Sequence, residues 1–75
     1  MDKLQAMNTF IRVVESGSFS AVAREKQTTQ SHVSKQVAAL ERELGVKLLS
    51  RTTRSLALTE AGERYFMQAR RLVAE

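Results

Sequence analysis

The side chains best suited to bind another molecule form a polar cluster between residues 29 and 36. Each member offers a hydrogen-bond donor or acceptor: Thr29, Gln30, Ser31, His32, Ser34, Lys35 and Gln36. A glutamine amide can pair with adenine N6 and N7, and a lysine ammonium can donate to guanine O6 and N7. Hydroxyls suit phosphate oxygens or base edges. The cluster therefore predicts contacts with nucleic acid, although an ordinary solvated helix face has a similar composition.

A second group of donors follows at residues 51–54, which read Arg51, Thr52, Thr53 and Arg54. Between two short strands, these residues would form a narrow tip carrying two guanidinium groups and two hydroxyls. The negative potential of a DNA minor groove attracts arginine, so this groove or the backbone beside it is the expected binding surface. The alternative is that Arg51 pairs with a nearby acid and only braces the tip.

Other kinds of site find little support in the sequence. There is no cysteine and His32 is the single histidine, so we expect no zinc site and no metal. We find no set of nucleophile, base and orienting group, and no glycine-rich phosphate loop. We therefore expect no cofactor and no catalytic activity, and place His32 against DNA or solvent.

The composition indicates one small basic domain. The 75 residues carry a formal net charge of +4, which favours an anionic partner such as nucleic acid or a membrane surface. The excess is concentrated in residues 24–54, where the acids are Glu25, Glu41 and Glu43 and the bases are Arg24, Lys26, Lys35, Arg42, Lys47, Arg51 and Arg54. No apolar run approaches the ~20 residues that span a bilayer, and no signal peptide is recognisable. We expect a cytoplasmic protein without a membrane partner.

Hydrophobic spacing predicts three helices in the first 45 residues. The first is ended by Gly17 and has one apolar face made of Leu4, Met7, Phe10, Ile11 and Val14. A short helix over residues 19–26 follows, capped by Ser18. After a polar break, Thr29 caps a third helix that Gly45 ends, with a buried stripe of Val33, Val37, Leu40 and Leu44.

The remaining residues predict a hairpin and a last helix. Leu56 and Leu58 alternate with polar or small residues, as in a half-buried strand. Thr59 is placed to cap the last helix. The apolar stripe of this helix exceeds what a small core needs, which predicts a dimer interface at Tyr65, Phe66, Ala69, Leu72 and Val73. A frayed amphipathic tail is the alternative.

This order of elements is a winged helix-turn-helix. The fold class expected is mostly α, with a three-helix core, a two-stranded β-hairpin wing and a long C-terminal linker or dimerisation helix. In this motif the second helix braces the third, whose N-terminal end enters the major groove. The expected partner is therefore double-stranded DNA, read by a homodimer on a palindromic site. The alternative is a winged-helix module for protein–protein contact, whose binding would depend less on salt.

The chain resembles the N-terminal domain of LysR-type transcriptional regulators. The resemblance rests on Met1, Asp2, Ala6, Met7 and Phe10, and on residues 13–23 (VVESGSFSAVA), 29–41 (TQSHVSKQVAALE), 44–54 (LGVKLLSRTTR) and 58–62 (LTEAG). It implies a DNA-binding domain at residues 1–59 with the helix-turn-helix at about 19–38, and a linker and dimerisation helix at residues 60–75. It also implies a C-terminal effector-binding domain outside this chain, which would bind a small molecule and allow a tetramer.

Three residues depart from the family pattern. Lys26 stands where leucine is usual and Thr28 where an aliphatic residue is usual, so each should weaken the core unless Lys26 keeps its amine in water. His32 replaces a small residue, which is expected to alter the bases that are read.

Overall fold

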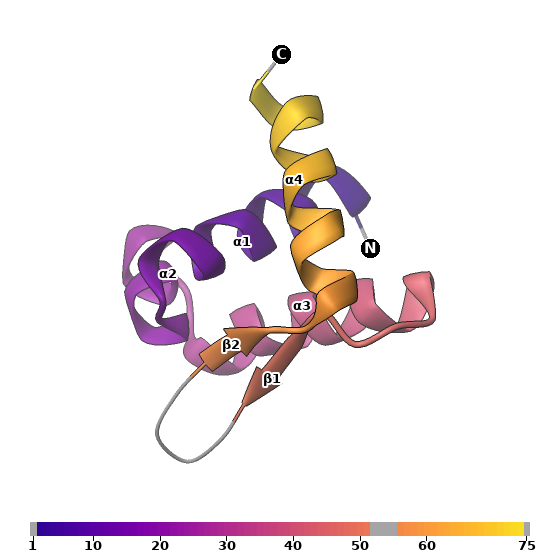
Figure 1. Cartoon of the computed structure of the whole chain (residues 1–75). Helices are drawn as coiled ribbons and strands as arrows, with labels where there is room; N and C mark the ends of the chain where they lie inside the picture. Colours follow the sequence, from indigo (N-terminus) through magenta and orange to yellow (C-terminus); the bar gives the residue numbers. More distant parts are fainter. Residues whose placement is uncertain (1, 52–55, 75) are drawn as a thin grey trace.

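The computed structural model describes residues 2–51 and 56–74, which form a helical body with one hairpin (Figure 1). The elements are, in chain order, α1 (Lys3–Ser16), α2 (Phe19–Glu25), α3 (Gln30–Leu44), β1 (Leu49–Arg51), β2 (Leu56–Leu58) and α4 (Glu60–Ala74). This order confirms the predicted fold class. The tip residues Thr52, Thr53 and Arg54 and the side chain of Arg51 lie outside the described part of the chain.

Each helix begins at a side chain that accepts a backbone N–H of its first turn. Ser18 accepts from Ala21, Thr29 from His32, and Thr59 from Gly62, at 3.1, 3.0 and 2.9 Å. These three contacts confirm the caps predicted from the sequence. Asp2 caps α1 in the same way, at 3.2 Å from the nitrogen of Gln5. Satisfied N–H groups at each start explain why the boundaries fall where they do.

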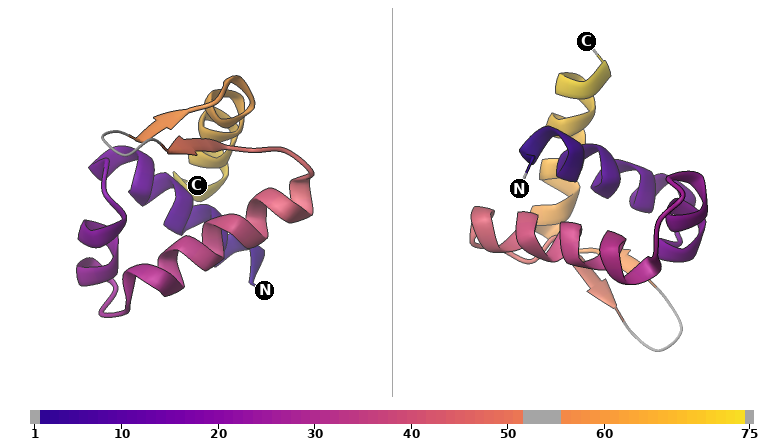
Figure 2. Two further views of the ribbon diagram at one scale, coloured as in Figure 1. Left: turned by 90° about the horizontal axis from the view of Figure 1, so that it is seen from below. Right: turned by 180° about the vertical axis from the view of Figure 1, so that it is seen from behind.

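The turn between α2 and α3 is compact. α2 ends at Glu25, one residue before the predicted end, and the nitrogen of Thr28 donates to the carbonyl of Ala23 at 2.9 Å. Gln27 reverses the chain with φ of 56°, in the left-handed region. A side chain in that conformation costs about 1 kcal/mol. The reversal sets the start of α3 beside α2 (Figure 2).

The core lies between α1, α2, α3 and the base of the hairpin. Its largest fully buried side chains are Phe10, Val13, Val22, Val33, Val37, Leu40 and Leu48. The predicted stripe of α3 is confirmed, with Leu44 only half-buried at its end.

Leu4 corrects the predicted core face of α1. Its side chain is 62% exposed, because α4 approaches the first turn of this helix without covering it. Leu4 instead lines an open groove of about 330 Å³ together with Leu72 and Val73 of α4. The groove places an apolar residue of the first turn beside the end of the chain.

The hairpin is held at its base by α3 and by the start of α4. Leu49 pairs with Leu58 and Arg51 with Leu56 in an antiparallel register. The carboxylate of Glu41 on α3 accepts from the nitrogens of Leu48 and Leu49, at 2.8 and 3.1 Å. The hydroxyl of Thr59 donates to the carbonyl of Lys47 at 2.6 Å. These bonds fix the direction in which the hairpin leaves the body.

α4 packs across α1 and then continues past it (Figures 1 and 2). The ring of Phe10 lies 5.7 Å from that of Tyr65 and 6.4 Å from that of Phe66, measured between centroids. Ala69 is fully buried, whereas Leu72 is 66% exposed. Burial against its own chain removes Ala69 from the surface predicted for a dimer, which corrects that expectation.

Gly62 is expected to be the least replaceable glycine of the fold. A Cβ atom at this position would overlap with the backbone carbonyl of Leu48 and lie 3.1 Å from a methyl of Leu58. We expect Gly62→Ala to lower the free energy of unfolding by about 3 kcal/mol in urea titration, because α4 and the hairpin must separate.

Gly45→Ala is the matched control. Gly45 has φ of 75° with nothing near an added Cβ, so only backbone strain of about 1 kcal/mol is expected. An equal loss in the two variants would contradict the close contact between α4 and Leu48.

Candidate nucleic-acid interface

The N-terminal half of α3 divides into a buried and an exposed side, as the sequence predicts. Val33 and Val37 are 0% and 1% exposed and rest on the core. Thr29, Gln30, Ser31, His32 and Lys35 are exposed, and Ser34 is half-buried. The buried underside therefore holds a row of polar side chains at the surface.

Most of this row has no partner within the described part of the chain. No hydrogen bond or ion pair there involves the side chains of Ser31, His32 or Lys35. The row also lies at a helix N-terminus, where the partial positive charge of the backbone favours anions. Together with the Lys35 ammonium, this makes the exposed row attractive to phosphate oxygens and to acceptor atoms of bases.

Gln30 is exposed, but its side chain already has a hydrogen-bond partner on α2. The hydroxyl of Ser20 on α2 donates to its Oε1 atom at 3.0 Å. This bond crosses the turn and joins the first residue of α3 to the first turn of α2. It leaves the Nε2 amide hydrogens without a partner in the described residues.

Gln36 differs from the rest of the predicted set. It is half-buried, as Ser34 is, and its Oε1 atom accepts from the hydroxyl of Thr9 at 2.9 Å. Thr9 is 1% exposed and lies on the inner face of α1. The contact ties α3 to α1, so Gln36 is placed to position the helix. The sequence reasoning missed Thr9, although its spacing from Ala6 and Val13 marks the buried face of α1.

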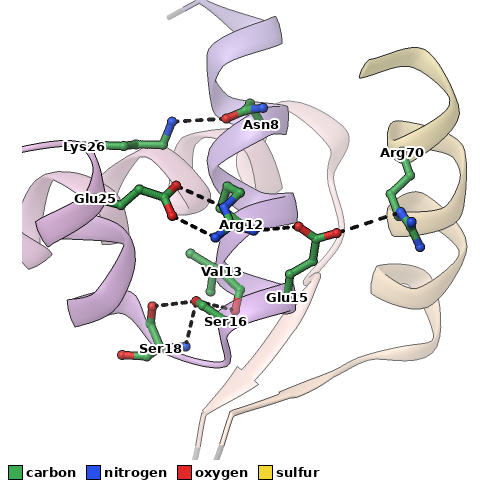
Figure 3. A network of polar contacts seen from close by, with 9 residues as sticks. All are labelled: Asn8, Arg12, Val13, Glu15, Ser16, Ser18, Glu25, Lys26 and Arg70. Carbon is green, nitrogen blue, oxygen red and sulfur yellow. Dashed lines mark hydrogen bonds and ion pairs between the residues drawn. The ribbon is translucent and has the colours of Figure 1, made fainter. Parts of the chain in front are cut away.

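A chain of charged contacts holds α2 against α1 (Figure 3). The guanidinium of Arg12 donates to both carboxylate oxygens of Glu25, at 3.0 and 2.7 Å, and to Glu15 at 2.8 Å. These hydrogen bonds, that to Glu25 foremost, raise the pKa of Arg12. The hydrogen bond from Arg12 likewise lowers the pKa of Glu25. Surface pairs contribute little energy, but the two-point contact fixes the angle of the bracing helix.

Lys26 does not enter the core in place of the usual leucine. Its Nζ atom donates to Oδ1 of Asn8 at 3.1 Å, on the surface between α2 and α1 (Figure 3). The residue is exposed and follows the last residue of α2. Lys26 therefore keeps its amine at the surface, which is the exception that the sequence left open, and it adds a second polar link between the two helices.

The hairpin points toward the same end of the molecule as the start of α3. The C-terminal end of β1 and the N-terminal end of β2 lie on that side in each view (Figures 1 and 2). Arg51 is the last residue of β1. The two strands therefore leave the body toward the side on which α3 begins (Figures 1 and 2).

These features define a winged helix-turn-helix protein: a short bracing helix, a tight turn, an amphipathic third helix and a hairpin. The family model described as "Bacterial regulatory helix-turn-helix protein, lysR family" matches residues 4–63. The chain belongs to this family, which confirms the resemblance seen in the sequence.

Similar proteins and solved structures support this family assignment. The chain is 51% identical over 75 residues to the HTH-type transcriptional activator AaeR of Escherichia coli, covering all of this chain and 24% of that protein. It is 49% identical over 71 residues to the HTH-type transcriptional regulator CrgA of Neisseria meningitidis, covering 95% and 24%. The chain thus spans about a quarter of the length of these relatives.

Two similar structures are described as complexes with DNA. A CbnR_DBD–DNA complex is similar with a TM-score of 0.88 and 37% identity, covering 95% of this chain and 82% of that one. A BenM_DBD complex with catB site 1 DNA has a TM-score of 0.89 and 34% identity, covering 95% and 80%.

The described residues contain neither a helix suited to cross a membrane nor a cluster suited to bind a metal. None of the helices over residues 2–51 and 56–74 combines the length and apolar character that crossing a bilayer requires. The same residues contain no group of three or more His, Cys, Asp or Glu side chains able to hold a metal ion.

The Thr9 and Gln36 contact should be visible in the stability of the fold. We expect Thr9→Val and Gln36→Leu each to lower the free energy of unfolding by about 1 kcal/mol, because each leaves a partly buried polar atom unpaired. The double variant should lose less than the sum of the two, since both partners are then apolar. Urea denaturation of the four proteins measures this, and strictly additive losses would contradict the contact.

Proposed function

We propose that this chain is the sequence-specific DNA-binding domain of a bacterial transcription regulator. In this proposal α3 reads the major groove, the hairpin wing contacts the minor groove or the backbone, and two copies bind a palindromic site. The observation that carries it is that the side chains of Ser31, His32 and Lys35 at the start of α3 are exposed and have no partner among the described residues. They lie above a fully buried apolar stripe on the same helix. The similarity to structures described as DNA complexes supports it.

The contact residues follow from the exposure of each side chain. We assign four side chains to base edges or phosphates: Gln30, Ser31, His32 and Lys35. Thr29 and Ser34 are assigned to the sugar-phosphate backbone of the DNA near these contacts. Gln36 is assigned to positioning because Thr9 holds its oxygen. The wing residues Arg51, Thr52, Thr53 and Arg54 remain proposed contacts on the strength of their chemistry.

The dimer surface is proposed along α4 and the groove that this helix forms with the start of α1. Tyr65 and Phe66 are half-buried against α1, while Leu72 and Val73 line the groove that Leu4 completes. A second copy of the chain would cover these apolar atoms. Pairing by a two-fold axis would also bring two α3 helices to successive turns of the DNA.

The rest of the proposal concerns the whole protein. Residues 1–59 would form the DNA-binding domain and residues 60–75 the linker and dimerisation helix. A C-terminal domain outside this chain would bind a small effector molecule and support a tetramer. The protein would act in the cytoplasm, without a catalytic role or a membrane partner.

Selection of bound oligonucleotides from a random pool tests the DNA-binding proposal. We expect the parent chain to select a motif with two symmetric half-sites. Gln30→Ala should bind that motif more weakly by about 1–3 kcal/mol and discriminate less at one position of each half-site. Equal binding by Gln30→Ala would contradict the contact, and weak dependence on salt would favour a protein partner instead.

A charge placed in the α4 groove tests the dimer proposal. We expect Leu72→Glu to weaken self-association about tenfold or more in analytical ultracentrifugation, because burying an unpaired carboxylate is costly. The body of the monomer should keep its fold, since Leu72 is 66% exposed.

Met67→Glu is the matched control for this variant. Met67 is also exposed, at 62%, on the same helix, but at 3.6 residues per turn it lies on a different face from Leu72. Equal effects of the two substitutions would contradict an interface centred on the groove.

A further inference from the structure

The hydrogen bond between Ser20 and Gln30 bears on which base is read. Ser20 lies in the first turn of α2 and is half-buried, whereas Gln30 is exposed at the first position of α3. The donor is the serine hydroxyl and the acceptor is Oε1 of the glutamine, 3.0 Å apart. One end of the reading side chain is therefore engaged before any DNA arrives.

The two ends of a glutamine amide have opposite hydrogen-bonding roles. Its oxygen only accepts and its nitrogen only donates. Recognition of adenine in the major groove uses both, because adenine offers an acceptor at N7 and a donor at N6. Guanine offers two acceptors, N7 and O6. The serine occupies one of the two lone pairs of the Gln30 oxygen, whereas both N–H groups stay without a partner in the described residues. This weakens the accepting end relative to the donating end, which favours guanine over adenine.

The surroundings of Gln30 reinforce this bias. Lys35 is exposed on the same half of α3, and its ammonium group can only donate hydrogen bonds. No carboxylate side chain lies between residues 26 and 40. The exposed row thus contains no side chain that can only accept a hydrogen bond.

We propose that Ser20 is a specificity-determining residue that holds the Gln30 amide so that it reads guanine in preference to adenine. The proposal rests on the DNA-binding function proposed above and names the base chemistry of that site. Ser20 acts through Gln30 and positions it, whereas a direct contact of its hydroxyl with a phosphate would affect all sequences alike.

Selection from a random oligonucleotide pool with Ser20→Ala tests the proposal. The position read by Gln30 is first identified as the one at which Gln30→Ala loses discrimination. There we expect the parent to prefer guanine over adenine, and Ser20→Ala to reduce that ratio about fivefold, the equivalent of one hydrogen bond. The other positions of the motif should keep their preferences. Alanine favours the helix, so thermal unfolding should show an intact fold.

Two further variants separate positioning from other roles. Ser20→Thr keeps a hydroxyl and should retain the parental ratio, and Ser20→Ala added to Gln30→Ala should change nothing further. An unchanged ratio in Ser20→Ala, or a parent that prefers adenine, overturns the proposal while DNA binding stands. A uniform loss across all sequences also overturns it and assigns Ser20 to the phosphates. A parent chain that selects no motif overturns the proposed function itself.

Discussion

The fold depends on the burial of one side of α3. Val33, Val37 and Leu40 are almost completely inaccessible to water, and complete burial of an aliphatic side chain is worth about 1.5–3 kcal/mol. Since the residues of a helix are related by a fixed rotation, burying this stripe determines where every other side chain of α3 points. The exposed position of Ser31 and Lys35 is therefore a consequence of the core.

The contacts around α3 serve to hold this helix at one angle. α1 reaches it through Thr9 and Gln36, and α2 reaches it through Ser20 and Gln30. α2 is itself fixed to α1 by Arg12 and Glu25. These links connect three helices in a closed circuit of polar contacts around the apolar centre. A rigid support of this kind reduces the entropy lost when a side chain is immobilised on a partner.

Much of the fold could be predicted because it is encoded locally. The caps at Ser18, Thr29 and Thr59 follow from single hydroxyl residues before amphipathic segments, and the α3 stripe follows from helical spacing. Leu4, Ala69 and Gln36 could not be placed in this way. Their exposure depends on which distant element packs against them. Helical periodicity identifies the apolar face of a helix but does not show how far along that face another element packs.

The protruding end of α4 gives the protein a dependence on its own concentration. The helix continues past α1 (Figure 1), and Leu72 in its last turns is 66% exposed. Short helical segments are marginal in water without tertiary packing. If a second copy supplies that packing, order in these turns is gained on association and lost on dilution. The quantity of protein in the cell would then set not only how much of it is paired but also how much of α4 is folded.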